Sequence, residues 1–147
     1  MPFVILLTIA VVVLICGFAI QAGDWTLQMA GIWILANIVL HGLLILVWSA
    51  SPTLHLIDDG IYATGLLPLA FFSVSPWIGA LAFLACGSFI LQSVYLLGDL
   101  KIDTIFVVIN NVVTIGCLLT LFSGAMAGVL ARRRARRADD MAGLAAA

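Results

Sequence analysis

The residues of this sequence that could do chemistry are polar side chains placed inside long apolar runs. Two pairs are separated by four positions, Asn37 with His41 and Ser88 with Gln92, so each pair shares one face of a helix. A polar side chain in hydrocarbon is costly and normally faces the interior of a helix bundle or water. The expected inward-facing set is Asn37, His41, Ser88, Gln92, Asn110 and Asn111.

This polar set has two interpretations. In the first, the side chains line a cavity open to the outer side of the membrane that accepts a proton, a cation or a small polar solute. His41 would then act through its protonation, because imidazole changes charge near physiological pH. In the second, the amides and hydroxyls only tie helices together by hydrogen bonds, and His41 is structural.

Other chemistry is not indicated by the sequence. A membrane haem needs two axial ligands, and His41 has no second histidine in a span, because His55 falls in the following connection. No set of His, Cys and carboxylate residues has the spacing of a zinc site. His55 with Asp58 and Asp59 lacks a nucleophile or a metal beside it. We therefore expect no cofactor, no metal and no enzymatic activity.

Composition places these residues in a membrane protein. Of 147 residues, 65% are hydrophobic and 9% are charged, whereas soluble domains carry about 25% charged residues. Helical crossing of a bilayer needs ~20 apolar residues, and four runs approach that length. They predict an all-α integral membrane protein, a bundle of four transmembrane helices at about 3–20, 29–50, 77–97 and 104–131, within a single domain 1–131.

The connection between the second and third runs also has two interpretations. Ser51-Pro52 ends the second run, because proline disfavours helix in the residue before it, and Asp58-Asp59-Gly60 indicates a solvated turn. The apolar segment 66–74 is too short to span and suggests a re-entrant or interfacial segment. Alternatively, this segment and the third run form one long helix that is kinked at Pro76.

A basic run decides the expected orientation. Basic residues beside a span remain in the cytoplasm, so the tail 132–147 is expected there, and four crossings bring the N-terminus to the same side. The loops 21–28 and 98–103 then face outward and surround the polar cavity with acidic residues. This topology suits a bacterial inner membrane. The anchoring residues are Arg132, Arg133, Arg134, Arg136 and Arg137.

Small residues recur every fourth position in the last run, at Gly116, Thr120, Gly124 and Gly128. Small side chains at this spacing let two helices approach closely. The pattern predicts a tight helix–helix contact, either with another helix of the chain or with a second copy.

These features predict a small, non-catalytic integral membrane protein. It would be a subunit or scaffold of a larger membrane complex, or form a homo-oligomer. The alternative is a small oligomeric carrier or channel for a proton, a cation or a small polar solute. The lipid bilayer is the partner in both cases, and the basic run is too short and too close to the membrane to favour nucleic acid.

Overall fold

The computed structural model describes residues 2–48, 51–100 and 103–145, all of which belong to helices or to the short connections between them. The chain forms five helices in these residues. Their bounds are α1 Pro2–Ala22, α2 Trp25–Trp48, α3 Pro52–Phe72, α4 Pro76–Leu97 and α5 Thr104–Ala145.

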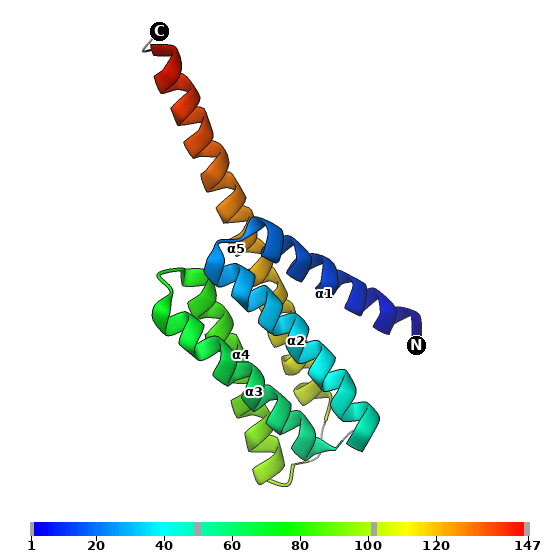
Figure 1. Cartoon of the computed structure of the whole chain (residues 1–147). Coiled ribbons are helices and arrows are strands. Elements are labelled where there is room, and N and C mark those ends of the chain that lie inside the picture. The colour runs from blue at the N-terminus through cyan, green and yellow to red at the C-terminus, as the bar shows by residue number, and fades with distance from the viewer. Residues whose placement is uncertain (1, 49–50, 101–102, 146–147) are drawn as a thin grey trace.

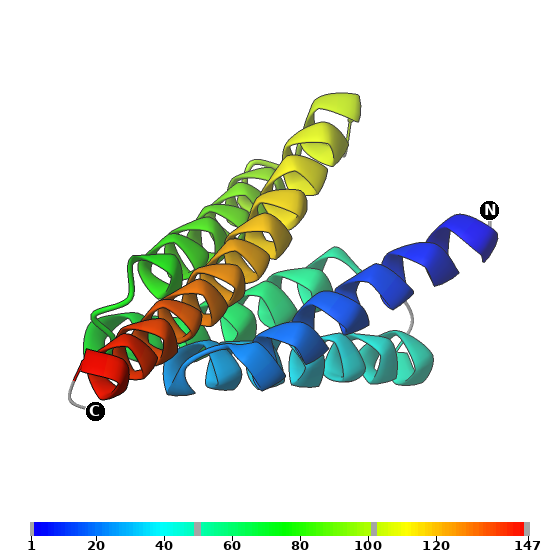
Figure 2. The ribbon, with the colours of Figure 1, turned by 90° about the horizontal axis from the view of Figure 1, so that it is seen from above.

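The helices α2 to α5 lie side by side, each antiparallel to the one before it, and α1 crosses them obliquely (Figure 1). The core between them is made of small and aliphatic residues, including the fully buried Cys16, Leu66, Leu81 and Leu121. The first turns of α1 diverge from the other helices in both views, and α5 continues well beyond them (Figure 2). The molecule is therefore a bundle from which two helix ends project.

Three helices are long and apolar enough to cross a membrane: Trp25–Leu44 within α2, Pro76–Leu97, and Thr104–Met141 within α5. The segment Leu7–Ala22 of α1 is apolar but shorter. Large apolar side chains are exposed along these helices, as expected where lipid rather than water covers them. In the described residues, an all-helical chain with three helices apolar enough to span a membrane is thus confirmed, and the count of four spans stays a prediction.

The expected turn at Asp58-Asp59-Gly60 and the expected continuous helix kinked at Pro76 were both wrong, because most of the segment 51–76 is a separate helix, α3. Ser51 caps that helix by accepting a hydrogen bond from the Leu54 backbone N–H at 3.2 Å, and Pro52 occupies its first turn. The segment 66–74 contains the end of α3, and its interpretation as a re-entrant or interfacial segment stays a prediction. Pro76 begins α4, where a missing N–H costs nothing, instead of kinking a continuous helix.

Because α3 is a separate helix, α1 and α2 each run in the direction opposite to the one expected from a bundle of four helices. The 21 residues of α3 span about 31 Å at 1.5 Å per residue, a full bilayer core, and this helix packs along α4. As a result α2 and α4 run in the same direction (Figure 1). We call the end of the bundle where α2 and α4 finish and α3 and α5 begin the cavity end, and the opposite end the arginine end.

The sequence predicted that the acidic loop residues gather at one end of the bundle, and this prediction was wrong. Asp24 lies at the arginine end, where it accepts a hydrogen bond from the Leu27 backbone N–H at 2.9 Å and so caps α2. There the Ser73 hydroxyl lies 3.3 Å from the Thr26 hydroxyl, which joins the α1–α2 and α3–α4 connections. Asp103 lies at the cavity end, where it accepts a hydrogen bond from Tyr95 at 3.2 Å.

The small residues of α5 face other helices of the same chain. A Cβ atom added at Gly124 would lie 2.9 Å from Trp77 and 3.0 Å from Leu27, and one at Gly116 would lie 3.3 Å from Leu84. One at Gly128 would lie 3.3 Å from the Ala22 carbonyl oxygen, and the Thr120 hydroxyl bonds back to the Gly116 carbonyl oxygen at 2.7 Å. This stripe is therefore a close contact within the chain rather than a free face.

The basic run lies on the part of α5 that projects beyond the arginine end (Figure 1). All five arginines are exposed there, as are Asp139 and Asp140. The expected tail thus continues the helix of the last apolar run through Ala145.

Candidate functional site

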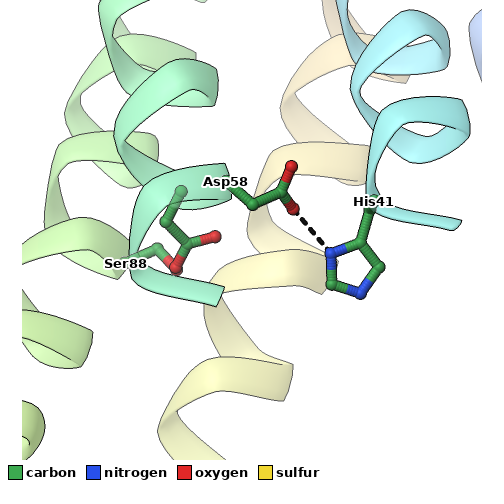
Figure 3. Close-up of polar contacts among 4 residues, drawn as sticks. His41, Asp58 and Ser88 are labelled. Atoms are coloured by element: carbon green, nitrogen blue, oxygen red, sulfur yellow. Dashed lines mark hydrogen bonds and ion pairs between the residues drawn. The ribbon is translucent and has the colours of Figure 1, made fainter. Parts of the chain in front are cut away.

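A histidine and an aspartate from adjacent helices form the shortest side-chain contact in the part of the chain that the structure describes. His41 Nδ1 of α2 lies 2.6 Å from Asp58 Oδ2 of α3 (Figure 3). Asp58 is 4% exposed, so its carboxylate depends on this imidazole for compensation. The His55 ring lies 5.1 Å from the His41 ring, so the expectation that His55 falls in a connection, where it could not pair with His41, was wrong. The helix α3 brings them together by folding back along α2.

A second polar contact joins α3, α4 and α5. The buried Ser88 hydroxyl lies 3.0 Å from Asp59 Oδ2 and 3.4 Å from Asn110 Oδ1. A hydroxyl has one proton, and it donates to the nearer and charged acceptor, Asp59. The Asn110 carboxamide can satisfy the other side of Ser88 by turning over, so that Nδ2 donates to the hydroxyl oxygen. Three helices are thus connected through one serine.

These contacts border a cavity of about 490 Å³ between the helices. Of the six polar residues expected to face inward, five line this cavity, and only Asn111 does not, being exposed on α5. Val12 of α1 also lines it, so all five helices contribute. The five expected residues on the cavity wall are Asn37, His41, Ser88, Gln92 and Asn110.

The sequence reasoning missed the polar residues of α3. His55, Asp59 and Tyr62 line the cavity, and Asp58 lies behind it on His41. These positions are spaced by three and four residues, which is the period of one helix face. That spacing, after the Ser-Pro pair that starts the helix, was the signal that could have found them.

The cavity lies toward the cavity end of the bundle. At 1.5 Å per residue, His41 is about 10 Å before the end of α2, and His55 about 5 Å after the start of α3. Gln92 is about 8 Å before the end of α4, and Asn110 about 9 Å after the start of α5. Four helices therefore bring polar side chains to a similar depth.

The charge of the cavity is acidic. Asp59 lines it and Asp58 is adjacent, whereas no lining residue in the described ranges is Lys or Arg. The arginines lie on the projecting part of α5, at the other end of the bundle. A negative side chain in a membrane interior is stabilised only by a partner or by a bound cation.

No family model, no curated protein and no solved structure matches this chain. Within the described side chains, no group of three or more His, Cys, Asp or Glu residues is placed to hold a metal ion. The cavity wall can exchange protons at two imidazoles and a carboxylate, and it can hydrogen-bond a solute through carboxamides and hydroxyls.

Proposed function

We propose that this protein is a small membrane carrier or channel that accepts a proton, a cation or a small polar solute in the cavity between its helices. The observation that supports this proposal is a cavity of about 490 Å³ with a carboxylate and two imidazoles on its wall, inside helices with apolar outer faces. Ionisable residues are expensive at membrane depth and normally mark a substrate or ion pathway there. Packing alone would not leave such groups around a space of ligand size.

The same proposal includes an orientation. Expecting both termini in the cytoplasm depends on four crossings, and α3 has the length of a further one. Its polar face is turned toward α2 and α4, so lipid would meet its apolar face. We propose five crossings of a bacterial inner membrane, with the arginine end in the cytoplasm. The cavity end and the N-terminus then face outward.

Flux in liposomes tests the carrier proposal. The purified chain is reconstituted into liposomes that contain a pH-sensitive dye, and a proton gradient is applied. We expect protein-dependent dissipation that is lost in Asp59→Asn, which removes the charge from the cavity wall and keeps the size of the side chain. Asp99→Asn is the matched control, because Asp99 is exposed outside the cavity. Equal flux in both variants would contradict a role for the cavity.

A subunit or scaffold of a larger membrane complex is the second candidate. The observation that favours it is the first part of α1, which diverges from the bundle and exposes Leu7, Ile9, Val13 and Leu14 (Figure 1). A partner helix or a second copy would cover this apolar face. Mass determination after mild-detergent purification separates the two candidates: a subunit brings stoichiometric partners, whereas a carrier is isolated alone or as a homo-oligomer.

A further inference from the structure

The cavity wall presents an acceptor that no donor in the described part of the chain satisfies. Asn37 lines the cavity, and its Oδ1 atom is buried without a hydrogen bond. Asp58 Oδ1 is also buried and unpaired, behind His41. A buried acceptor without a partner costs free energy, so this arrangement favours a ligand that brings N–H or O–H donors.

The charges around the cavity indicate the sign of the charge that the ligand should carry. His41 is committed to Asp58 by the 2.6 Å contact, so a protonated His41 neutralises Asp58 and nothing more. In the described side chains, Asp59 accepts a hydrogen bond from the neutral Ser88 hydroxyl and has no ion pair, because His55 on the same wall makes none. A carboxylate with this environment is best compensated by a positive group inside the cavity.

The size and the apolar part of the wall exclude a bare metal ion. A space of about 490 Å³ is in the range of organic ligand sites and far larger than a dehydrated cation. Ile34, Phe106, Val113 and Leu118 form much of the wall. Aliphatic side chains and an aromatic ring fit a hydrocarbon body, and a ring face also attracts a cation.

We propose that the cavity binds a small primary ammonium compound with an apolar body. Asp59 is the counter-ion of the ammonium group, Asn37 on the same wall accepts one of its N–H donors, and the hydrocarbon part lies against Phe106 and the aliphatic wall. This inference rests on the proposed function, because it names the substrate class of the same cavity.

A series of near-isosteric probes tests the proposal on the unmodified chain. The full-length protein in detergent is titrated calorimetrically with 2-phenylethylammonium, with the neutral 2-phenylethanol and with the anionic phenylacetate. We expect the ammonium probe to bind at least about tenfold more tightly than the alcohol, and the anion not to bind, since a desolvated charge pair is discriminating. Equal affinity for the alcohol, preference for the anion, or no binding of any probe would overturn the proposal.

A charge-neutralising variant locates the site. Asp59→Asn should weaken binding of 2-phenylethylammonium at least about tenfold and leave that of 2-phenylethanol unchanged. Asp99→Asn carries the same change at an exposed position with a φ of 49°, which asparagine tolerates, and should bind as the original chain does. Unchanged affinity in Asp59→Asn would overturn the assignment. If Asp59→Asn does not fold, the probe series on the unmodified chain still decides.

The two proposals fail separately. Binding of 2-phenylethylammonium without flux of protons or of the probe in liposomes contradicts the carrier and leaves the binding site standing. Proton flux without binding of the ammonium probe contradicts the substrate class and leaves the carrier standing.

Discussion

A buried carboxylate beside a half-exposed imidazole makes His41 the most informative single residue of this protein. Asp58 is 4% exposed, whereas the His41 side chain is 38% exposed, so the pair lies at the border of the cavity rather than in a dry core. Removing the imidazole leaves the buried carboxylate without a donor, whereas replacing it with another donor keeps the carboxylate hydrogen-bonded. Structural and titrating roles of His41 can therefore be separated by the choice of substitution.

The first prediction concerns stability. His41→Leu should lower the free energy of unfolding by about 2–3 kcal/mol, less than breaking a fully buried pair because His41 is partly exposed. His41→Gln should cost less than about 1 kcal/mol, because its amide can still donate to Asp58. Thermal unfolding in detergent measures both. Equal destabilisation by the two substitutions would show that the hydrogen bond to Asp58 contributes nothing.

The second prediction concerns protonation. The titratable groups that face His41 are Asp58 and, close by, His55 and Asp59, all from α3. We expect His41→Gln to fold but to lose the change of flux across about pH 5 to 8, the range in which imidazole titrates. His55→Gln removes the second imidazole of the cavity wall, which contacts the His41 ring but has no ion pair in the described side chains, and shows whether the pH dependence belongs to His41 alone. An unchanged pH profile in His41→Gln would make His41 purely structural.

At the scale of the elements, apolar runs predicted four helices well and could not predict α3. The runs at 3–20, 29–50, 77–97 and 104–131 correspond to α1, α2, α4 and α5 within a few residues, except at the C-terminal end of α5. The length of an apolar run follows directly from the thickness of a bilayer. The last run extends further, because its polar continuation is also helical.

The sequence of α3 resembles a solvated turn because its polar residues have partners far along the chain. Asp58 meets His41, which is 17 residues away, and Asp59 meets Ser88, which is 29 residues away. Local reasoning sees two adjacent acids and a glycine, a turn signal. Only the packed bundle shows that the two acids point at different helices. For the same reason, helical spacing found the cavity residues of α2 and α4 but not those of α3.

The third prediction tests the packing of α3 against α2. The indole of Trp33 occupies the space where a side chain at Gly65 would begin, and it donates a hydrogen bond to the Tyr62 carbonyl oxygen at 3.2 Å. Gly65→Ala should therefore displace Trp33 and lower the free energy of unfolding by about 1–3 kcal/mol. Gly42→Ala, with open space around it, should be neutral or stabilising. Tryptophan fluorescence with thermal unfolding distinguishes them, and equal behaviour would contradict this contact.

The fourth prediction tests the small-residue stripe of α5. Gly124 touches Trp77 and Leu27, so Gly124→Leu should overfill the contact and cost about 1–3 kcal/mol or disrupt folding. Gly87→Leu is the control, because Gly87 on α4 faces open space. Size-exclusion chromatography and thermal unfolding provide the readout. Loss of oligomers without loss of monomer stability would show instead that the stripe joins two copies.

At the scale of the whole molecule, the proposed crossing by α3 decides on which side of the membrane the N-terminus lies. His55, Asp59 and Tyr62 of α3 line the cavity together with residues of α2, α4 and α5. If α3 did not cross the bilayer, these three side chains would come from a segment outside it. In a crossing helix whose polar face is turned inward, the polar side chains line the cavity and the apolar side chains meet the lipid. In that topology the cavity lies toward the face opposite the arginines, where cations are not repelled by them.

The last prediction is that Thr53 and Ser73 lie on opposite sides of the membrane. Thr53 lies in the first turn of α3 and Ser73 directly follows its last residue, and both topologies place Ser73, beside the arginine end, in the cytoplasm. Five crossings place Thr53 outside, whereas four place it in the cytoplasm. In a variant in which Cys16, Cys86 and Cys117 are replaced by alanine, we introduce Thr53→Cys or Ser73→Cys. A membrane-impermeant thiol reagent added to intact cells should label Thr53→Cys alone. Labelling of neither until the cells are opened would return the chain to four crossings and move its N-terminus to the cytoplasm, because the arginine run fixes only the C-terminal side.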